Sequence, residues 1–321
     1  MKPKNCLIFG ASGLIGRHLI RKLTKNNFKV TAITRNIHQK GYLLKTQGNP
    51  GYIEIIESSI FDENKIRGLI KKADICINLI GILYQKGKIN TFENIHEKFP
   101  NFLSDICREY NVKQFIHLSA LGIENAKDSL YARSKLKGEI SIRNNFREAN
   151  ILKPSVVYSV DDNFTTNFMT ILNLSPIFPL YYNGSTLFRP IHVSDLTEII
   201  FQIIFQNINS ITLECIGPEE ISLKNILKRL LKLIGKKRLL IPIPLILAQL
   251  SAIFFQSFPR PLITLDQLKL LKYQNIPSGE YKTNFDLKIP SYANFDNEVK
   301  KYSYMWKDGG QFSIFKERNS N

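Results

Sequence analysis

Three residues near the middle of the sequence have the types and spacing needed for proton transfer. Ser119 ends an apolar run, Tyr131 follows twelve residues later, and Lys135 lies four positions beyond Tyr131. A separation of four puts the tyrosine and the lysine on one helix face, about 6 Å apart along the axis. A nearby ammonium group favours phenolate, so Tyr131 can exchange a proton with a substrate oxygen that Ser119 holds. We predict catalytic roles for Ser119, Tyr131 and Lys135, with a nicotinamide carrying hydride.

A glycine-rich turn near the start of the chain has the pattern of a dinucleotide-binding loop. Residues 10–16 read GASGLIG and lie between a short apolar run and apolar residues at helical spacing. The three glycines permit a tight turn, a close backbone approach to a pyrophosphate, and close packing of helix on sheet. The predicted cofactor contacts in this turn are Gly10, Ser12, Gly13, Leu14, Ile15 and Gly16.

The end of the second predicted strand distinguishes between the two nicotinamide dinucleotides. An acidic residue there would bind the ribose 2′-hydroxyl and repel a 2′-phosphate. The chain instead has Thr34, Arg35 and Asn36. Arg35 can form a charge-assisted pair with a 2′-phosphate. We therefore predict that Arg35 is a cofactor contact and that NADP(H) is favoured over NAD(H).

Further cofactor contacts are expected where later strands end, because ligands bind beside the carboxyl ends of parallel strands. The predicted contacts are Ser59 and Ile60 at the adenine, Leu79, Ile80 and Gly81 at the ribose and pyrophosphate, Pro154, Ser155 and Val156 at the nicotinamide, and Tyr131 and Lys135. Pro154 would fix the turn that meets the carboxamide.

Alternating strands and helices must position these residues. Apolar strand patterns cover 5–9, 28–33, 52–56, 74–80, 114–118, 150–153 and 156–158, and helix patterns cover 14–23, 63–72, 91–110 and 131–145. Strands that are apolar throughout indicate a parallel sheet covered on both faces. The predicted fold class is α/β: a Rossmann-type doubly wound parallel sheet with a smaller, mostly helical C-terminal lobe.

The alternation decays beyond residue 160, where prolines interrupt a mixture of helices and loops. We expect an NAD(P)-binding domain over 1–160, with 185–206 packing back on it, and a smaller substrate or partner lobe over 161–321. Asp195 is expected to cap a helix over 196–205 rather than to pair with His192 in acid–base chemistry.

The chain is strongly basic. Its 321 residues include 44 Lys and Arg against 27 Asp and Glu, a formal net charge of +17. This excess indicates an acidic partner, or it reflects an A+T-rich genome that enriches Lys, Asn and Ile; both explanations stay open. We expect no nucleic-acid partner, because no recognition module accompanies the charge.

The most concentrated positive charge precedes the most apolar part of the chain. Seven Lys or Arg and no acid occur over 224–238, and 239–255 is almost wholly apolar but interrupted by prolines. That apolar run is too short and broken to be a good membrane span. Residues 224–258 can dock on an anionic membrane surface or on partner subunits. The alternative is a solvated basic helix followed by a helix buried in the fold.

The cysteines and the N-terminus indicate a location. Cys6, Cys76, Cys107 and Cys215 have no metal-ligand or redox spacing, so we expect no metal site and a reducing compartment. The apolar run over 6–9 is too short for the apolar region of a signal peptide. The expected location is the cytoplasm, with peripheral binding to the inner face of the cytoplasmic membrane as a further expectation.

Together these motifs resemble extended short-chain dehydrogenases/reductases of the epimerase/dehydratase type. Within them, the resemblance points to the atypical branch named for the alpha-subcomplex subunit nine of respiratory complex I. It covers nearly the whole chain and is carried by 10–17, 78–83, 117–120, 131–135 with Gly138 and Glu139, 154–155, 188–195, 217–218, 266–271, 304–306 and 309–312. Two positions depart from the family pattern: Lys153 replaces an arginine, and Ser59 replaces Asp or Asn. The helix asparagine of the superfamily has no secure counterpart over 94–101.

The resemblance implies a tightly held NADPH and a role as an accessory subunit of respiratory complex I, near the membrane. It also implies that bacterial relatives keep more of the catalytic residues, and Ser119, Tyr131 and Lys135 all match. Two hypotheses therefore stand. One is a structural, cofactor-binding role with complex I; the other is an active NADP-dependent oxidoreductase or epimerase acting on a sugar nucleotide or a lipid-like alcohol.

Overall fold

The structure, a computed structural model, describes residues 3–256, 258, 261 and 263–310. Gln311 and Phe312 of the last predicted motif lie outside the described residues, as does Ser257 of the 224–258 stretch. The chain divides into two compact units. The first comprises Met1–Pro154, Leu196–Cys215 and Gly279–Ile289, and the second comprises Ser155–Asp195, Ile216–Ser278 and Pro290–Asn321. The domain boundary near residue 160 and the packing of 185–206 stay predictions.

A parallel eight-stranded sheet runs through the first unit, in the order β3-β2-β1-β4-β5-β6-β11-β14. Its strands are β1 (Asn5–Phe9), β2 (Lys29–Thr34), β3 (Ile53–Glu57), β4 (Ile75–Asn78), β5 (Gln114–Leu118), β6 (Asn150–Pro154), β11 (Thr212–Cys215) and β14 (Lys282–Thr283). The order of the first six strands is that of the Rossmann fold, with its switch point between β1 and β4. The predicted doubly wound parallel sheet is confirmed.

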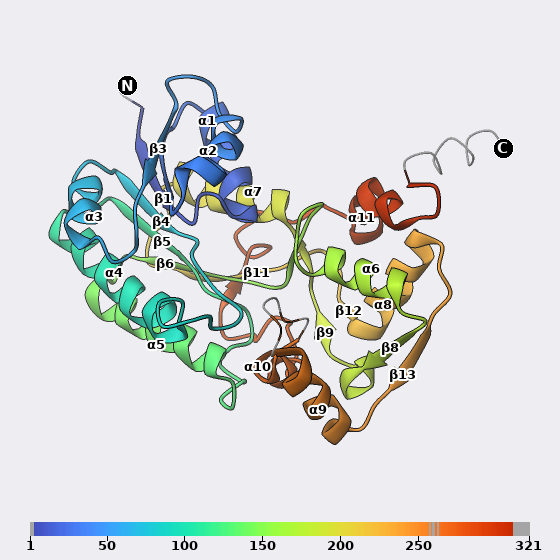
Figure 1. Ribbon diagram of the computed structural model, residues 1–321. Helices are drawn as coiled ribbons and strands as arrows, with labels where there is room; N and C mark the ends of the chain where they lie inside the picture. The colour runs from blue at the N-terminus through green and yellow to red at the C-terminus, as the bar shows by residue number, and fades with distance from the viewer. Residues whose placement is uncertain (1–2, 257, 259–260, 262, 311–321) are drawn as a thin grey trace. The chain divides into compact units, whose positions relative to one another are not determined.

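Helices cover both faces of this sheet (Figure 1). On one face lie α1 (Leu14–Lys25), α2 (Ile37–Lys45) and the 196–205 part of α7 (Val193–Phe205); on the other lie α3 (Glu63–Ile70), α4 (Phe99–Glu109) and α5 (Leu130–Asn145). Side chains of α3, α4 and α5 form one buried apolar cluster with the strands, in which Phe9 and Phe99 meet edge to face. Because both faces are covered, the central strands are buried, as their apolar sequences predicted.

Two features of these helices differ from the sequence-based expectation. Helix α2 was not predicted, because its stabilising contacts are polar: Asn36 caps its first turn, and Glu57 from β3 accepts the Ile37 N–H. The single helix expected over 91–110 instead begins with a π-helical segment, η1 (Glu93–Lys98). Pro100 has no N–H to offer the carbonyl of His96, so the regular helical hydrogen bond cannot form there.

The second unit is mostly helical, as predicted. Its helices are α6 (Thr165–Leu174), α8 (Leu223–Ile234), α9 (Leu245–Gln256), α10 (Leu265–Leu270) and α11 (Phe295–Ser303), with short 3-10 turns η2 (Tyr181–Gly184) and η3 (Tyr304–Trp306). Three two-stranded ribbons pair β7 (Val157–Tyr158) with β10 (Ile191–His192), β9 (Leu187–Phe188) with β12 (Ile221–Ser222), and β8 (Ile177–Leu180) with β13 (Leu239–Pro242). Its main core is built on α8, whose inward side chains include Leu227 and Leu230.

The backbone packs so closely at the start of α1 that a side chain at Gly16 should destabilise the fold. A Cβ at Gly16 would lie 2.5 Å from the carbonyl oxygens of Gly10 and Ala11. Gly16→Ala should therefore lower the free energy of unfolding by about 1–3 kcal/mol, the usual cost of overpacking. Urea unfolding followed by circular dichroism measures the change.

Gly68→Ala is the matched control, because a Cβ at this helical position in α3 meets nothing within 4 Å. This change should raise the free energy of unfolding by about 0.5–1 kcal/mol. Equal stability of Gly16→Ala and wild type would contradict the packing argument.

Candidate functional site

The glycine turn lies against the end of β4. Gly10 has a φ of +79°, and a Cβ on it would lie 3.0 Å from the carbonyl carbon of Leu79. Gly13 is the N-cap of α1, no side chain caps that helix, and its first turn contains no acid. The uncapped N–H groups and the helix dipole favour an anion at this position. The turn therefore has the shape and the charge preference that a pyrophosphate requires.

The carboxyl end of β2 presents two groups beside that turn. The Thr34 side-chain hydroxyl is buried and has no hydrogen-bond partner among the described residues. Arg35 Nη1 donates to Asn90 Oδ1 at 3.0 Å, which holds the guanidinium near the loop that follows β4. A buried hydroxyl without a partner costs about 1–3 kcal/mol, so Thr34 fits a ligand oxygen. Neither Thr34 nor Asn90 was singled out from the sequence.

The other predicted contacts of the first unit follow neighbouring strands. Ile80 N–H donates to Asn78 Oδ1 at 3.1 Å, and a Cβ at Gly81 would lie 3.3 Å from Lys135 Nζ. Ser59 is exposed and accepts the Phe61 N–H at 3.2 Å, so its hydroxyl is not committed to the core. The structure thus brings the segment after β4 together with the glycine turn and the lysine of α5.

The turn after β6 is divided between the two units. Pro154 ends β6, and its carbonyl accepts the Leu121 N–H at 3.0 Å. Ser155 and Val156 belong to the second unit, where Asn275 Oδ1 accepts from Ser155 Oγ at 2.6 Å and from Val156 N at 3.2 Å. Asn275, 120 residues away from Ser155 in the chain, carried no signal in the sequence.

Helix α5 presents Tyr131 and Lys135 from its first two turns. The helix starts where it does because Ser129 caps it and accepts the Ala132 N–H. Lys135 is fully buried and its Nζ donates to the carbonyl of Leu118 at 3.0 Å, immediately before Ser119. Burial lowers the pKa of Lys135 to about 8. Lys135 therefore links the α5 helix to the strand end that carries Ser119.

His96 packs beneath Tyr131 and was missed from the sequence. Its ring lies edge-on to Tyr131, with centroids 5.3 Å apart. Nε2 accepts the Ile82 N–H at 3.1 Å, so the hydrogen of the neutral ring lies on Nδ1, which contacts Ser134 Oγ at 2.9 Å. Burial, and then the charge of Lys135, lowers the pKa of His96 to about 2. A neutral histidine thus joins the segment after β4 to α5.

A second buried histidine lies on β5, two residues before Ser119. The amide of Asn78 donates to His117 Nδ1 at 3.1 Å, because the Asn78 oxygen already accepts the Ile80 N–H. The hydrogen of the ring is therefore on Nε2, which has no partner among the described residues. Burial, and then Lys135, holds the pKa of His117 well below its usual value.

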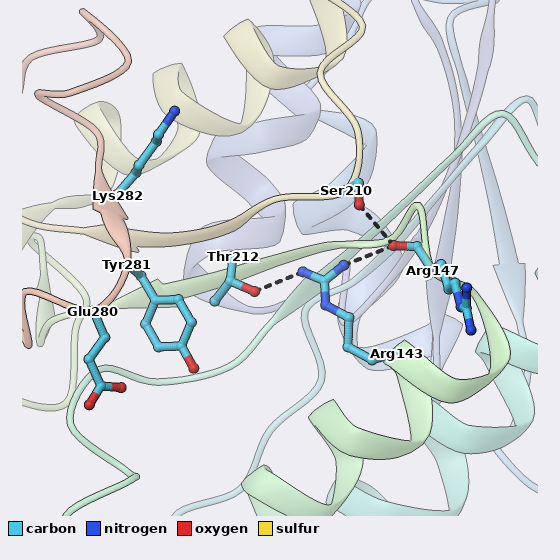
Figure 2. A pocket seen from close by; sticks show the side chains of 7 residues that line it. All are labelled: Arg143, Arg147, Ser210, Thr212, Glu280, Tyr281 and Lys282. Atoms are coloured by element: carbon cyan, nitrogen blue, oxygen red, sulfur yellow. Dashed lines mark hydrogen bonds between the residues drawn. The ribbon is translucent and has the colours of Figure 1, made fainter.

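A hollow of about 540 Å³ on the first unit is a poor candidate for the same site (Figure 2). Its lining includes Arg143, Thr212 and Lys282, and the latter two begin β11 and β14. Ligands of parallel sheets bind at the opposite, carboxyl ends of the strands. Arg143 is moreover committed to the Thr212 hydroxyl and to the carbonyls of Arg147, Ala149 and Ile211.

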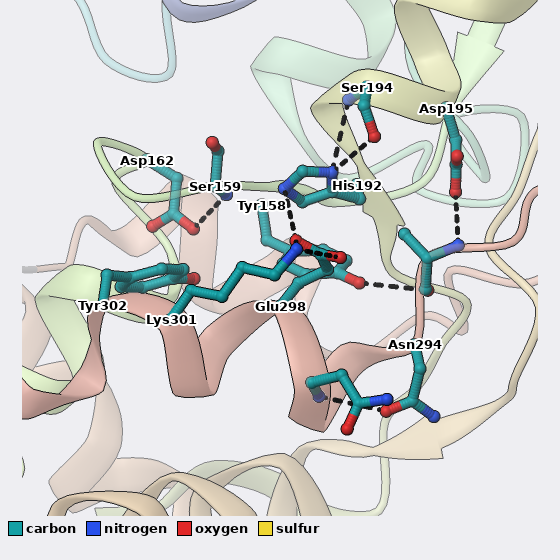
Figure 3. Close-up of polar contacts among 12 residues, drawn as sticks. Tyr158, Ser159, Asp162, His192, Ser194, Asp195, Asn294, Glu298, Lys301 and Tyr302 are labelled. Carbon is teal, nitrogen blue, oxygen red and sulfur yellow. Dashed lines mark hydrogen bonds and ion pairs between the residues drawn. The ribbon is translucent and has the colours of Figure 1, made fainter. Parts of the chain in front are cut away.

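A polar cluster in the second unit corrects the role expected for Asp195 (Figure 3). Helix α7 begins at Val193, so Asp195 lies inside its first turn rather than at a cap before Leu196. The Asp195 carboxylate accepts the N–H groups of Tyr292 and Ala293 at 3.1 and 2.9 Å. Asp195 therefore anchors the segment that leads into α11.

Comparison with known proteins agrees with this architecture. A UDP-glucuronic acid 4-epimerase from Bacillus cereus, solved with NAD, superposes with a TM-score of 0.70 at 18% identity, covering 95% of this chain and 100% of that one. DesIV, a dTDP-glucose 4,6-dehydratase from Streptomyces venezuelae solved with NAD, gives 0.70 at 15% identity, with 94% and 96% covered. At these identities the likeness establishes the fold.

Relatives by sequence include respiratory proteins. The chain is 26% identical over 310 residues to the mitochondrial NADH-ubiquinone oxidoreductase 40 kDa subunit of Neurospora crassa, covering 96% of this chain and 80% of that protein. It is 27% identical to the alpha subcomplex subunit 9 of Arabidopsis thaliana NADH dehydrogenase, covering 66% and 53%. A ceramide reductase of Caulobacter vibrioides is 24% identical, covering 59% and 57%.

A protein family matches most of the first unit. This is the NAD dependent epimerase/dehydratase family, and the match spans residues 6–210, from the first strand to the residues before β11. That span contains the glycine turn and the Ser119, Tyr131 and Lys135 positions, and it exceeds half of the chain. The chain belongs to the NAD dependent epimerase/dehydratase family.

Proposed function

We propose that this protein binds NADPH and acts with respiratory complex I as an accessory subunit. The observation that carries the proposal is its similarity to the 40 kDa subunit along 96% of the chain. We also propose a cytoplasmic location, with peripheral binding to the inner face of the cytoplasmic membrane. Ser119, Tyr131 and Lys135 would then help to bind the cofactor or catalyse a separate reaction.

The residues at the carboxyl end of the sheet fit such a cofactor. The glycine turn and the N-terminus of α1 would hold the pyrophosphate, and Gly81 would leave room beside the ribose. Thr34 and Arg35 would bind the 2′-phosphate, through an unpartnered hydroxyl and a guanidinium group. When bound, the dinucleotide supplies or accepts hydride. Arg35 and Asn36, rather than an acid, follow β2 in the chain, which favours NADP(H) over NAD(H). The Glu57 carboxylate from β3 accepts the Ile37 N–H.

Loss of the Arg35 guanidinium should weaken NADPH binding selectively. A hydrogen bond to a charged group contributes about 1.5–3 kcal/mol, so Arg35→Ala should raise the NADPH dissociation constant roughly 10- to 150-fold. The NADH constant should change little. Isothermal titration calorimetry measures both.

Arg21→Ala is the control, since Arg21 lies on the exposed side of α1 and pairs with Gln47. It should leave both dissociation constants unchanged. If Arg35→Ala raised the dissociation constants of NADPH and NADH equally, the proposed contact with the 2′-phosphate would be contradicted.

A surface of the second unit suits a membrane-associated location. Helix α9 packs small residues inward, Ala248 and Ala252, and leaves large apolar side chains exposed. The exposed set is Leu245, Ile246, Leu247, Leu250, Ile253 and Phe254, and residues 239–258 contain no charged side chain. Single exposed apolar residues are ordinary, but a continuous set on one helix is typical of interaction sites. No helix among the described residues is long and apolar enough to cross a membrane.

Positive charge on α8, the helix that precedes α9 in the chain, favours an acidic surface. Lys224, Lys228 and Lys232 are exposed and share one stripe of α8 at four-residue spacing. Arg229 and Lys236 are instead paired with Glu219 and Asp308. A lysine stripe on α8 would bind anionic lipid headgroups or an acidic partner subunit, and the exposed apolar face of α9 would add apolar contacts.

Fractionation of respiratory membranes tests the complex I proposal. The tagged protein should sediment with membranes and, after mild detergent extraction, comigrate with NADH-oxidising activity on a native gel. Full release from membranes by 1 M salt without comigration would indicate lipid docking alone. Recovery only in the soluble fraction would contradict the association.

A second candidate function is an NADP-dependent oxidoreductase or epimerase acting on a lipid-like alcohol or a sugar nucleotide. Helix α5 carries Tyr131 and Lys135 one turn apart, and Lys135 is linked to the strand end at Ser119. The similarity to a ceramide reductase favours the lipid-like class. Burial of Lys135 shifts its pKa toward the range in which a proton exchanges near neutral pH.

Replacement of the tyrosine separates this candidate from a purely structural role. Tyr131→Phe should lower turnover by at least 100-fold, since general acid–base catalysis contributes about 10²–10⁴-fold, while NADPH affinity stays within about twofold. Absorbance of NADPH at 340 nm follows turnover with sphingoid ketones and long-chain alcohols. Chromatographic separation of the epimers follows turnover of sugar nucleotides, because an epimerase returns its cofactor to the starting redox state. An unchanged rate in Tyr131→Phe would remove the proposed catalytic role.

A further inference from the structure

A buried ionic cluster lies directly behind Ser119. Lys153 on β6 is fully buried, and its Nζ lies 2.9 Å from Glu139 Oε2 and pairs also with Glu124. The other oxygen of Glu139, Oε1, accepts a hydrogen bond from Ser119 Oγ. The proposed function uses Ser119 and leaves Glu139, Lys153 and Glu124 without a role.

The ammonium group of Lys153, 2.9 Å from Glu139 Oε2, favours the ionised form of this carboxyl. Burial raises the pKa of the Glu139 carboxyl, and the adjacent ammonium of Lys153 opposes that shift. Burial lowers the pKa of Lys153, but Glu139 and Glu124 together raise it above its usual value, so this lysine stays charged at neutral pH. An ammonium group can only donate, which leaves the Glu139 oxygen that faces it as an acceptor.

The hydrogen of Ser119 is consequently directed away from the ligand side of the strand. A serine hydroxyl has one hydrogen and two lone pairs, and an ionised carboxylate has only acceptor sites. The hydrogen bond from Ser119 to the ionised Glu139 carboxylate therefore uses the single hydrogen of Ser119. A carbonyl oxygen placed against Ser119 would meet lone pairs rather than a donor.

We propose that Glu139, held by Lys153, is a positioning residue that makes Ser119 a hydrogen-bond acceptor toward its ligand. The group that Ser119 binds is then a hydroxyl or another donor, and a carbonyl oxygen would take its hydrogen bond from Tyr131 rather than from Ser119. The inference rests on the proposed function in one respect: it takes Ser119 as a residue that contacts the ligand.

The two carboxylates beside Lys153 provide a matched pair of variants. Glu139→Gln keeps the shape of the side chain but removes the charge, and its amide can donate to Ser119 Oγ and free the serine hydrogen. Glu124→Gln removes the same charge from the same lysine, and Glu124 has no hydrogen bond to Ser119 among the described residues. Only Glu139→Gln should change the hydrogen bond that Ser119 makes.

Carbon-13 NMR of protein labelled at the serine β-carbon reads the hydroxyl hydrogen directly. In an equal mixture of H₂O and D₂O, a slowly exchanging hydroxyl gives two β-carbon signals, and a rapidly exchanging one gives a single averaged signal. Ser119, assigned by its loss in Ser119→Ala, should give two signals in wild type and Glu124→Gln, and one in Glu139→Gln. A single signal in wild type, or the same response to both glutamine variants, would overturn the proposal.

A second measurement applies if Glu139→Gln does not fold. Labelling at the glutamate carboxyl carbon reports whether Glu139 is ionised in the wild-type protein, with the signal assigned by its shift in Ser119→Ala. At pH 7 the chemical shift should be that of a carboxylate. A protonated carboxyl at pH 7 would overturn the proposal, because Ser119 could then donate to its ligand.

Calorimetry with NADPH on the same samples keeps the two proposals separate. Failure to bind NADPH contradicts the proposed function and leaves the Ser119–Glu139 result unaffected. NADPH binding together with a rapidly exchanging Ser119 hydroxyl contradicts the positioning role alone.

Discussion

Backbone-to-backbone contact at the carboxyl edge of the sheet is the constraint on which the first unit depends. The turn after β1 touches the peptide that follows β4 through Gly10, and α1 returns over that turn through Gly16. Side chains cannot mediate these contacts, because a Cβ would collide with main-chain atoms. The same closeness leaves the N-terminus of α1 uncapped and aimed at the switch point. The close packing of the glycine turn and the preference of the α1 N-terminus for an anionic ligand therefore have the same geometric cause.

Behind this edge the buried lysines of the first unit are hydrogen-bonded, and its buried histidines are neutral. Lys153 satisfies two glutamates, Lys135 uses a main-chain carbonyl, and His96 and His117 are neutral. A buried charge is tolerated only when it is paired and hydrogen-bonded. These hydrogen bonds hold the buried lysines and histidines under α5 in fixed orientations. The neighbouring residues that face a ligand are held in place by the same contacts.

Local patterns in the sequence predicted the sheet, the glycine turn and the spacing on α5, because each depends on neighbouring residues. The short strands β11 and β14 could not be predicted, since they join the sheet from distant parts of the chain. Asn275 and Glu57 act through contacts that only the folded chain makes. The link from Ser119 to Lys153 was equally hidden, although Glu139 belongs to a recognised motif and Lys153 was noted as a departure from it.

The π-helical segment η1 makes the residue that is allowed at position 138 depend on the residue at position 100. Pro100 leaves the His96 carbonyl without its helical partner, and a Cβ at Gly138 would lie only 2.0 Å from that oxygen. A residue with an N–H at position 100 would draw the carbonyl back into the helix and remove the reason for glycine at 138. Position 138 therefore cannot accept a side chain at low cost while position 100 is proline, and this close contact packs α5 against η1.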